Sequence, residues 1–100
     1  MRPIGGAIDR ALRKLGLERD IARVSALEAW PDAARDVFGP SAAATRAVGL
    51  SDGALVVAVP DATWSGEIRL REAELVAAIA RRATSDIEHI RTVPATERRH

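Results

Sequence analysis

The side chains that carry out most enzyme chemistry are few and scattered in this chain. The two histidines, His89 and His100, are too few for a metal site without help from carboxylates. We expect His89 to be solvated or packed rather than to act as a ligand or a base. The chain has no cysteine, so it has neither disulfides nor thiolate chemistry. No recognisable nucleophile motif surrounds Ser41, Ser51, Ser65 or Ser85.

Motifs for cofactors and metals are missing as well. The sequence contains no phosphate loop of the form GxxxxGKS/T, no GxGxxG and no HExxH. Gly5 and Gly6 begin a helical pattern with no strand before them, so they do not indicate a nucleotide site. The sequence therefore predicts a protein that is not an enzyme and has no cofactor, no metal site and no small-molecule substrate.

The basic side chains could provide a different chemistry, the contact of phosphate groups. Those that share predicted helix faces are Arg10, Arg13, Lys14, Arg69, Arg71, Arg81 and Arg82. They form either a solvated helix exterior or a weak surface that positions a nucleic-acid backbone without reading its sequence. With 15 basic and 14 acidic residues, the net charge of +1 excludes the strongly basic class. The predicted strands carry no aromatic residue, so base stacking on a sheet is not expected.

The two tryptophans have two possible roles. Trp30 ends a helical stripe beside Pro31, and Trp64 lies in the first turns of a predicted helix. Each indole is either a core anchor with its N–H hydrogen-bonded or a contact for a partner, because tryptophan is enriched at binding hot spots.

Length and hydropathy indicate one small domain. A chain of 100 residues fits a single core, and no apolar run approaches the ~18 residues of a membrane span. Charges interrupt the first residues, unlike a signal peptide. We therefore expect a cytoplasmic protein with one domain over residues 1–93 and a disordered polar tail over residues 94–100.

Helical periodicity fills the first half of the chain. The spacing predicts a helix from Pro3 to Leu15 and a second helix from about Glu18, with Val24 and Leu27 on its apolar stripe. Pro31 is expected to interrupt this second helix. Gly39-Pro40 marks a further stop, after which residues 41–45 can form one more helical turn.

The period then changes to that of strands. Residues 46–50 and 54–59 read as strands joined at Asp52-Gly53, a strong hairpin signal. The second run is apolar on both faces, which predicts a central strand ended by Pro60.

A long helix and a last strand complete the pattern. The helix is capped by Asp61 or Thr63 and runs to about Ala83, with an i,i+4 pair of Glu67 and Arg71. Residues 87–93 form the last strand. The fold class is α+β, with the order helix, helix, strand, strand, helix, strand and a three-stranded sheet covered by helices on one face.

The ordered set of motifs resembles the DciA family of bacterial proteins over about residues 4–93. It comprises Trp30, Asp36-Val37-Phe38-Gly39, residues 42–45, residues 50–59, Thr63-Trp64, Glu67-Ile68 and Leu70. The resemblance implies a KH-like domain that binds the replicative helicase DnaB and single-stranded or branched DNA and is not an ATPase. It also implies that Trp64 and Trp30 shape the surface offered to the helicase.

The leading hypothesis is therefore a non-enzymatic adaptor, in the cytoplasm at the nucleoid, that promotes DnaB loading onto single-stranded DNA. The alternative is a general KH-like nucleic-acid-binding module without a helicase role. Three features depart from the family pattern. Pro31 follows Trp30 directly, only the short ATERRH tail follows the last strand, and no GxxG loop occurs. We therefore expect any contact with DNA to be weak.

Overall fold

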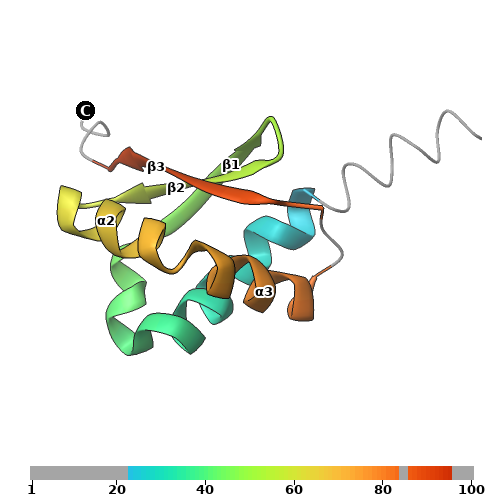
Figure 1. Cartoon of the computed structure of the whole chain (residues 1–100), viewed down its shortest axis with the longest axis horizontal. Coiled ribbons are helices and arrows are strands. Elements are labelled where there is room, and N and C mark those ends of the chain that lie inside the picture. Colours follow the sequence, from blue (N-terminus) through green and yellow to red (C-terminus); the bar gives the residue numbers. More distant parts are fainter. Residues whose placement is uncertain (1–22, 84–85, 96–100) are drawn as a thin grey trace, which may run out of the picture.

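The computed structural model describes residues 23–83 and 86–95, and its elements follow the predicted α+β class (Figure 1). The elements are a helix over residues 23–38, the 3₁₀ helix η1 (Gly39–Ala44), strands β1 (Arg46–Ser51) and β2 (Ala54–Val59), helices α2 (Ala62–Leu70) and α3 (Glu72–Arg82), and strand β3 (His89–Pro94). The predicted helix from Pro3 to Leu15 and residues 96–100 of the predicted tail lie outside the described residues.

The three strands form a mixed sheet in the order β1-β2-β3. β1 runs antiparallel to β2, and the turn between them places Asp52 at a φ of 51° and Gly53 at a φ of 80°. β3 runs parallel to β2, from the pair Ala54↔His89 to the pair Val59↔Pro94. The predicted hairpin and the central place of β2 are thus confirmed. Pro94 is tolerated at the end of β3 because this strand lies at the edge of the sheet.

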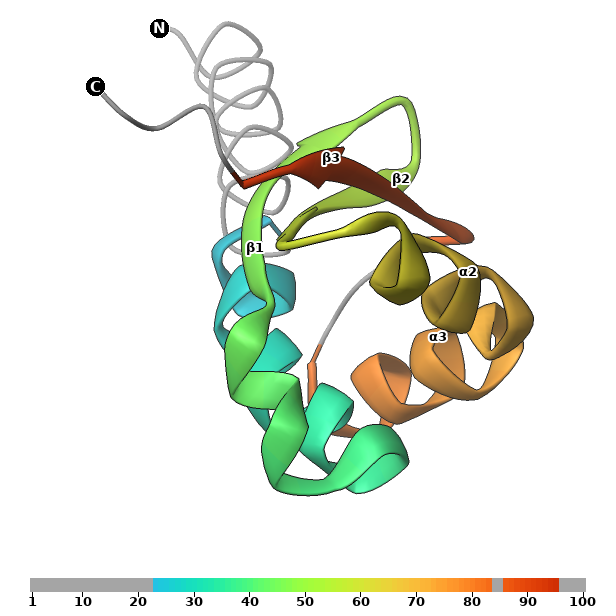
Figure 2. The same ribbon diagram turned by 90° about the vertical axis from the view of Figure 1, so that its left-hand side faces the viewer.

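The core lies between β2 and the helices. Leu55 and Val57 of β2 are fully buried and share one cluster with Ile68 of α2 and with Leu75 and Ile79 of α3. The described helices lie together on this side of the sheet (Figure 2). Helices α2 and α3 thus both turn large apolar side chains toward the sheet, where these are removed from water.

The predicted long helix is two helices rather than one. Arg71, at a φ of −110° and a ψ of 21°, separates α2 from α3. Hydrogen bonds continue across it, since its N–H donates to the Glu67 carbonyl at 3.1 Å. The backbone leaves helical geometry at Arg71, so its side chain no longer lies over Glu67. The predicted pair of Glu67 with Arg71 is absent, and Arg71 Nη1 lies 3.4 Å from Glu74 Oε1 instead.

Pro31 does not end the helix in which it stands. Residues 23–38 are helical throughout, although a proline in a helix interior costs about 3 kcal/mol. The inward face on both sides of Pro31 is buried, with Ala29, Trp30, Ala33 and Ala34 at 7% exposure or less. The burial of these side chains outweighs the unfavourable helix propensity of proline, because tertiary packing often overrides local propensity.

The face that turns inward matches the predicted stripe only in part, since Leu27 packs against the core but Val24 does not. Val24, which the predicted stripe places in the core, is 50% exposed. Small residues such as Ala26, which is fully buried, take the inward positions instead. Alanine lets the helix approach its neighbours closely, and a stripe counted from large apolar residues alone misses this.

A buried hydrogen bond fixes Trp30 against the start of the sheet. The Trp30 indole, 1% exposed, donates its Nε1–H to Thr45 Oγ1 at 3.0 Å. Thr45 Oγ1 in turn donates to the Ala42 carbonyl at 2.7 Å. The hydroxyl therefore links the 23–38 helix, η1 and the residue before β1.

Replacing Thr45 by valine should destabilise the fold by about 1–3 kcal/mol, because the buried indole N–H loses its acceptor. Urea unfolding followed by tryptophan fluorescence measures the change. Thr63→Val is the matched control, since Thr63 is an exposed threonine in the first turn of α2. Equal stability of the two variants would contradict the assigned role of the hydroxyl.

Candidate functional site

Trp64 joins α2 to the helix of residues 23–38. Asp61 caps α2 by accepting the Trp64 backbone N–H at 3.1 Å, which confirms one of the two predicted caps. The Trp64 ring is half-buried and meets Phe38 edge to face, with ring centroids 5.1 Å apart and planes at 80°. Such a pair adds about 0.5–1.5 kcal/mol beyond the burial of area. The indole thus anchors two helices while part of it stays at the surface.

Trp30 lies apart from this surface. At 1% exposure its side chain belongs to the core. A substitution of Trp30 would therefore affect partner binding only by changing how the core packs. The predicted partner-binding roles of Trp30 and Trp64 remain predictions.

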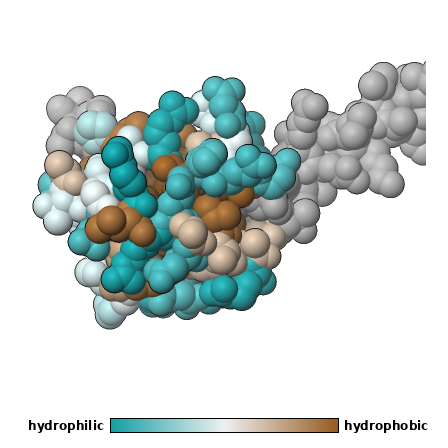
Figure 3. Space-filling view, viewed as in Figure 1, coloured by the Kyte–Doolittle hydropathy of each residue, from teal (hydrophilic) through white to brown (hydrophobic). Residues whose placement is uncertain are grey.

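Leu70 is the most exposed large hydrophobic residue among those described, at 80%. It ends α2, and around Gly66, one turn earlier, the space that a Cβ would enter is open. On the face shown in Figure 3, hydrophobic side chains form separate patches among hydrophilic ones. Sequence reasoning placed Leu70 in the family motif but did not single it out as a site, because its exposure depends on where α2 ends.

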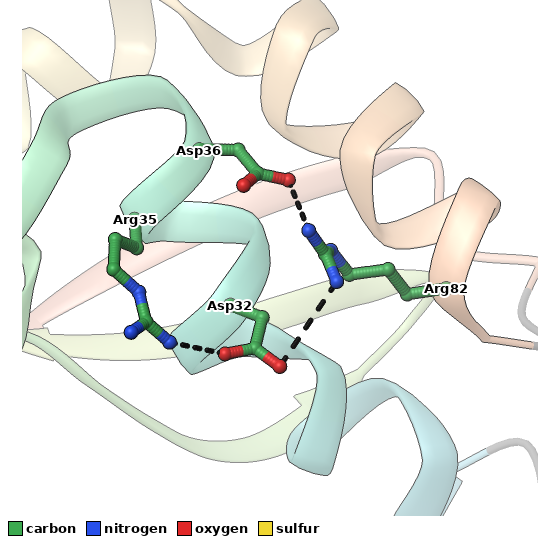
Figure 4. Close-up of polar contacts among 4 residues, drawn as sticks. All are labelled: Asp32, Arg35, Asp36 and Arg82. Carbon is green, nitrogen blue, oxygen red and sulfur yellow. Dashed lines mark hydrogen bonds and ion pairs between the residues drawn. The ribbon is translucent and has the colours of Figure 1, made fainter.

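Arg82 is held by acidic residues of the 23–38 helix (Figure 4). Its guanidinium hydrogen-bonds to Asp36 and lies 4.0 Å from Asp32, which also pairs with Arg35. The hydrogen bond from Arg82 lowers the pKa of Asp36 from its usual 3.8, and the same contact raises the pKa of Arg82. Arg82 therefore ties α3 to the helix of residues 23–38.

The other predicted phosphate-contacting residues differ in their surroundings, and their role remains a prediction. Arg71 pairs with Glu74. Arg69 and Arg81 are exposed and make no ion pair with a residue that the structure describes, but they lie on different helices. The remaining three, at positions 10, 13 and 14, lie outside the described residues.

A polar groove runs between α2 and β3, with a volume of about 310 Å³. We call this the α2–β3 groove, and its lining residues are Ser65, Ile68, Arg69, Glu72, Ile90, Arg91 and Thr92. Sequence reasoning missed Arg91, because its position beside Arg69 depends on the parallel pairing of β3 with β2. No local signal predicts that pairing.

The described residues carry no group of three or more His, Asp or Glu side chains placed to hold a metal ion. Within the same residues, no helix has the length and apolar character needed to cross a membrane.

The family model for the Dna[CI] antecedent, DciA, matches residues 3–92. The chain therefore belongs to the DciA family, as its resemblance predicted. Family membership makes it a non-enzymatic factor that loads or operates the DnaB helicase in the initiation of replication. No curated protein matches the chain significantly.

The pairing of Asp36 with Arg82 predicts a pH-dependent contribution to stability. Because the pKa of Asp36 is depressed in the folded state, its contribution is present above the unfolded value and is lost as the pH falls through the folded one. Asp36→Asn should therefore lower the Tm at pH 7, and the difference from wild type should shrink as the pH falls below about 4.

Thermal unfolding followed by circular dichroism between pH 7 and pH 2 measures this effect. Asp86→Asn is the control, since Asp86 is exposed and lies between α3 and β3, outside the cluster around Arg82. A Tm difference between Asp36→Asn and the wild type that is constant with pH would show that the ion pair with Arg82 does not contribute to the stability of the fold.

Proposed function

We propose that this member of the DciA family acts as an adaptor that binds the DnaB ring in a loadable arrangement. Binding shifts the ring toward that arrangement only if the chain binds it more tightly than the closed ring. The observation that carries the proposal is the surface of α2, with Trp64 anchored at its start and Leu70 exposed at its end. The ring pair fixes the position of α2, and Leu70 offers an exposed apolar side chain that a protein partner could bury.

A KH-like fold is proposed for the domain. The order helix, strand, strand, helix, helix, strand supports it, together with the parallel pairing of β3 and β2. A single residue, Arg71, separates α2 from α3 and leaves no room for a GxxG loop. Contact with single-stranded or branched DNA would therefore use side chains in place of loop amides, and we propose that it is weak and salt-dependent.

The proposed location is the cytoplasm, at the nucleoid, where DnaB and its DNA are found. A general nucleic-acid-binding module without a helicase role is the competing function. Steep salt dependence of DNA binding without helicase binding would favour that module. Helicase binding that persists in salt favours the adaptor, because apolar contacts are not screened by ions.

Replacing Leu70 by serine should weaken binding to DnaB by roughly tenfold, the loss expected when an interface side chain worth about 1.4 kcal/mol is removed. The Tm should not change, because the side chain is 80% exposed in the free chain. Surface plasmon resonance with immobilised DnaB measures the affinity.

Val24→Ser is the matched control, because Val24 is also an exposed apolar residue on a helix, at 50% exposure. The control should bind DnaB like the wild type. If Leu70→Ser binds as tightly as Val24→Ser, the helicase contact lies elsewhere on the chain. Trp64→Leu serves as a second probe, with its Tm measured alongside because this variant also lacks the ring pair with Phe38.

A further inference from the structure

Two arginines from different elements line the α2–β3 groove. Arg69 stands in the last turn of α2, and Arg91 lies on β3 opposite Val56 of β2. Both are exposed, and neither forms an ion pair with a residue that the structure describes. Arg35, Arg71 and Arg82, in contrast, are each held by a carboxylate. The groove thus combines two guanidinium groups that are available to a ligand.

A pair of hydroxyl groups spans the same groove. Ser65 Oγ of α2 and Thr92 Oγ1 of β3 lie 2.9 Å apart and share a hydrogen bond. One hydroxyl donates to the other, so the accepting hydroxyl keeps its own proton for a further acceptor. The pair also joins α2 to β3 across the groove.

The one carboxylate of the groove is already engaged. Glu72 Oε2 accepts the Ile90 backbone N–H at 2.8 Å and lies 3.5 Å from His89 Nδ1. The hydrogen bond satisfies a backbone N–H of the edge strand β3, and it holds the negatively charged carboxylate beside that strand. With two arginines and one glutamate, the lining carries a formal charge of +1, so the groove favours an anion.

We propose that the α2–β3 groove binds a phosphate group, with Arg69 and Arg91 on its oxygens and a hydroxyl of the Ser65–Thr92 pair as a further donor. Guanidinium groups match phosphate oxygens in a planar, two-bond geometry. The phosphate is either a diester of single-stranded DNA or a free monoester. The first source rests on the proposed DNA contact, and the second does not.

The test compares two double variants that remove equal charge. Arg69→Gln with Arg91→Gln removes the guanidinium groups of the groove. Arg23→Gln with Arg46→Gln removes two exposed arginines that do not line it. Fluorescence anisotropy with a labelled poly-dT oligonucleotide over a salt series forms one arm. Titration with inorganic phosphate and with dTMP, followed by two-dimensional NMR, forms the other.

The groove variant should bind the oligonucleotide about tenfold more weakly than the control variant, a difference of about 1.4 kcal/mol, because it lacks charge-assisted hydrogen bonds to phosphate. Its slope of log K against log salt should also be shallower by about 0.7 for each phosphate group that the variant no longer neutralises. Arg69→Lys with Arg91→Lys, which keeps the charge but not the planar geometry, should restore only part of the affinity.

Loss of phosphate or dTMP binding in the groove variant, with unchanged oligonucleotide binding, would support the site and assign it to a free monoester. If both glutamine variants weaken binding equally in both arms, or if neither weakens it, the α2–β3 groove is not a phosphate site. In that case, oligonucleotide binding by the wild-type chain would still support the proposed DNA contact. Absence of oligonucleotide binding by the wild-type chain would contradict that contact, whatever the phosphate arm shows.

Discussion

The need to pair both edges of β2 and to bury its apolar side chains is the constraint on which the rest of this structure depends. A strand of six residues with no charged side chain is stable only between two other strands and beneath a layer of helices. β1 satisfies one edge through the Asp52-Gly53 turn, and β3 satisfies the other by returning parallel to β2. That return requires a crossover, which α2 and α3 provide. The helices therefore cover the face of the sheet and create the groove beside β3.

Few large side chains build the core, so single contacts between elements carry much of the specificity. Alanines line the inward face of the 23–38 helix and let it pack closely. The Trp30–Thr45 hydrogen bond, the Trp64–Phe38 ring pair and the Arg82–Asp36 ion pair each join segments far apart in the sequence. They give the chain a fixed surface, which a protein that works by binding needs. A helicase loader of the DciA family requires such a surface and no reaction of its own.

Local signals predicted the features that depend on few neighbours. The hairpin follows from Asp52-Gly53, the cap of α2 from Asp61, and the central strand from an apolar run. The break at Arg71 and the continuation of the helix through Pro31 were not predictable, because packing against other elements decides both. The candidate site follows the same division. The motif pointed to Trp64, whose role as a partner contact remains a prediction. The pairing of Arg82 with Asp36 and the groove shared by Arg69 and Arg91 depend on the tertiary fold.

Direct binding of this chain to DnaB of the same organism, at low and moderate salt, tests the central claim most directly. A parallel titration with single-stranded DNA alone separates the two partners. The account predicts saturable helicase binding that persists at moderate salt, because its main contact is apolar, together with DNA binding that weakens steeply. Helicase binding that is absent or that disappears with salt while DNA binding remains would contradict an adaptor that works through the surface of α2.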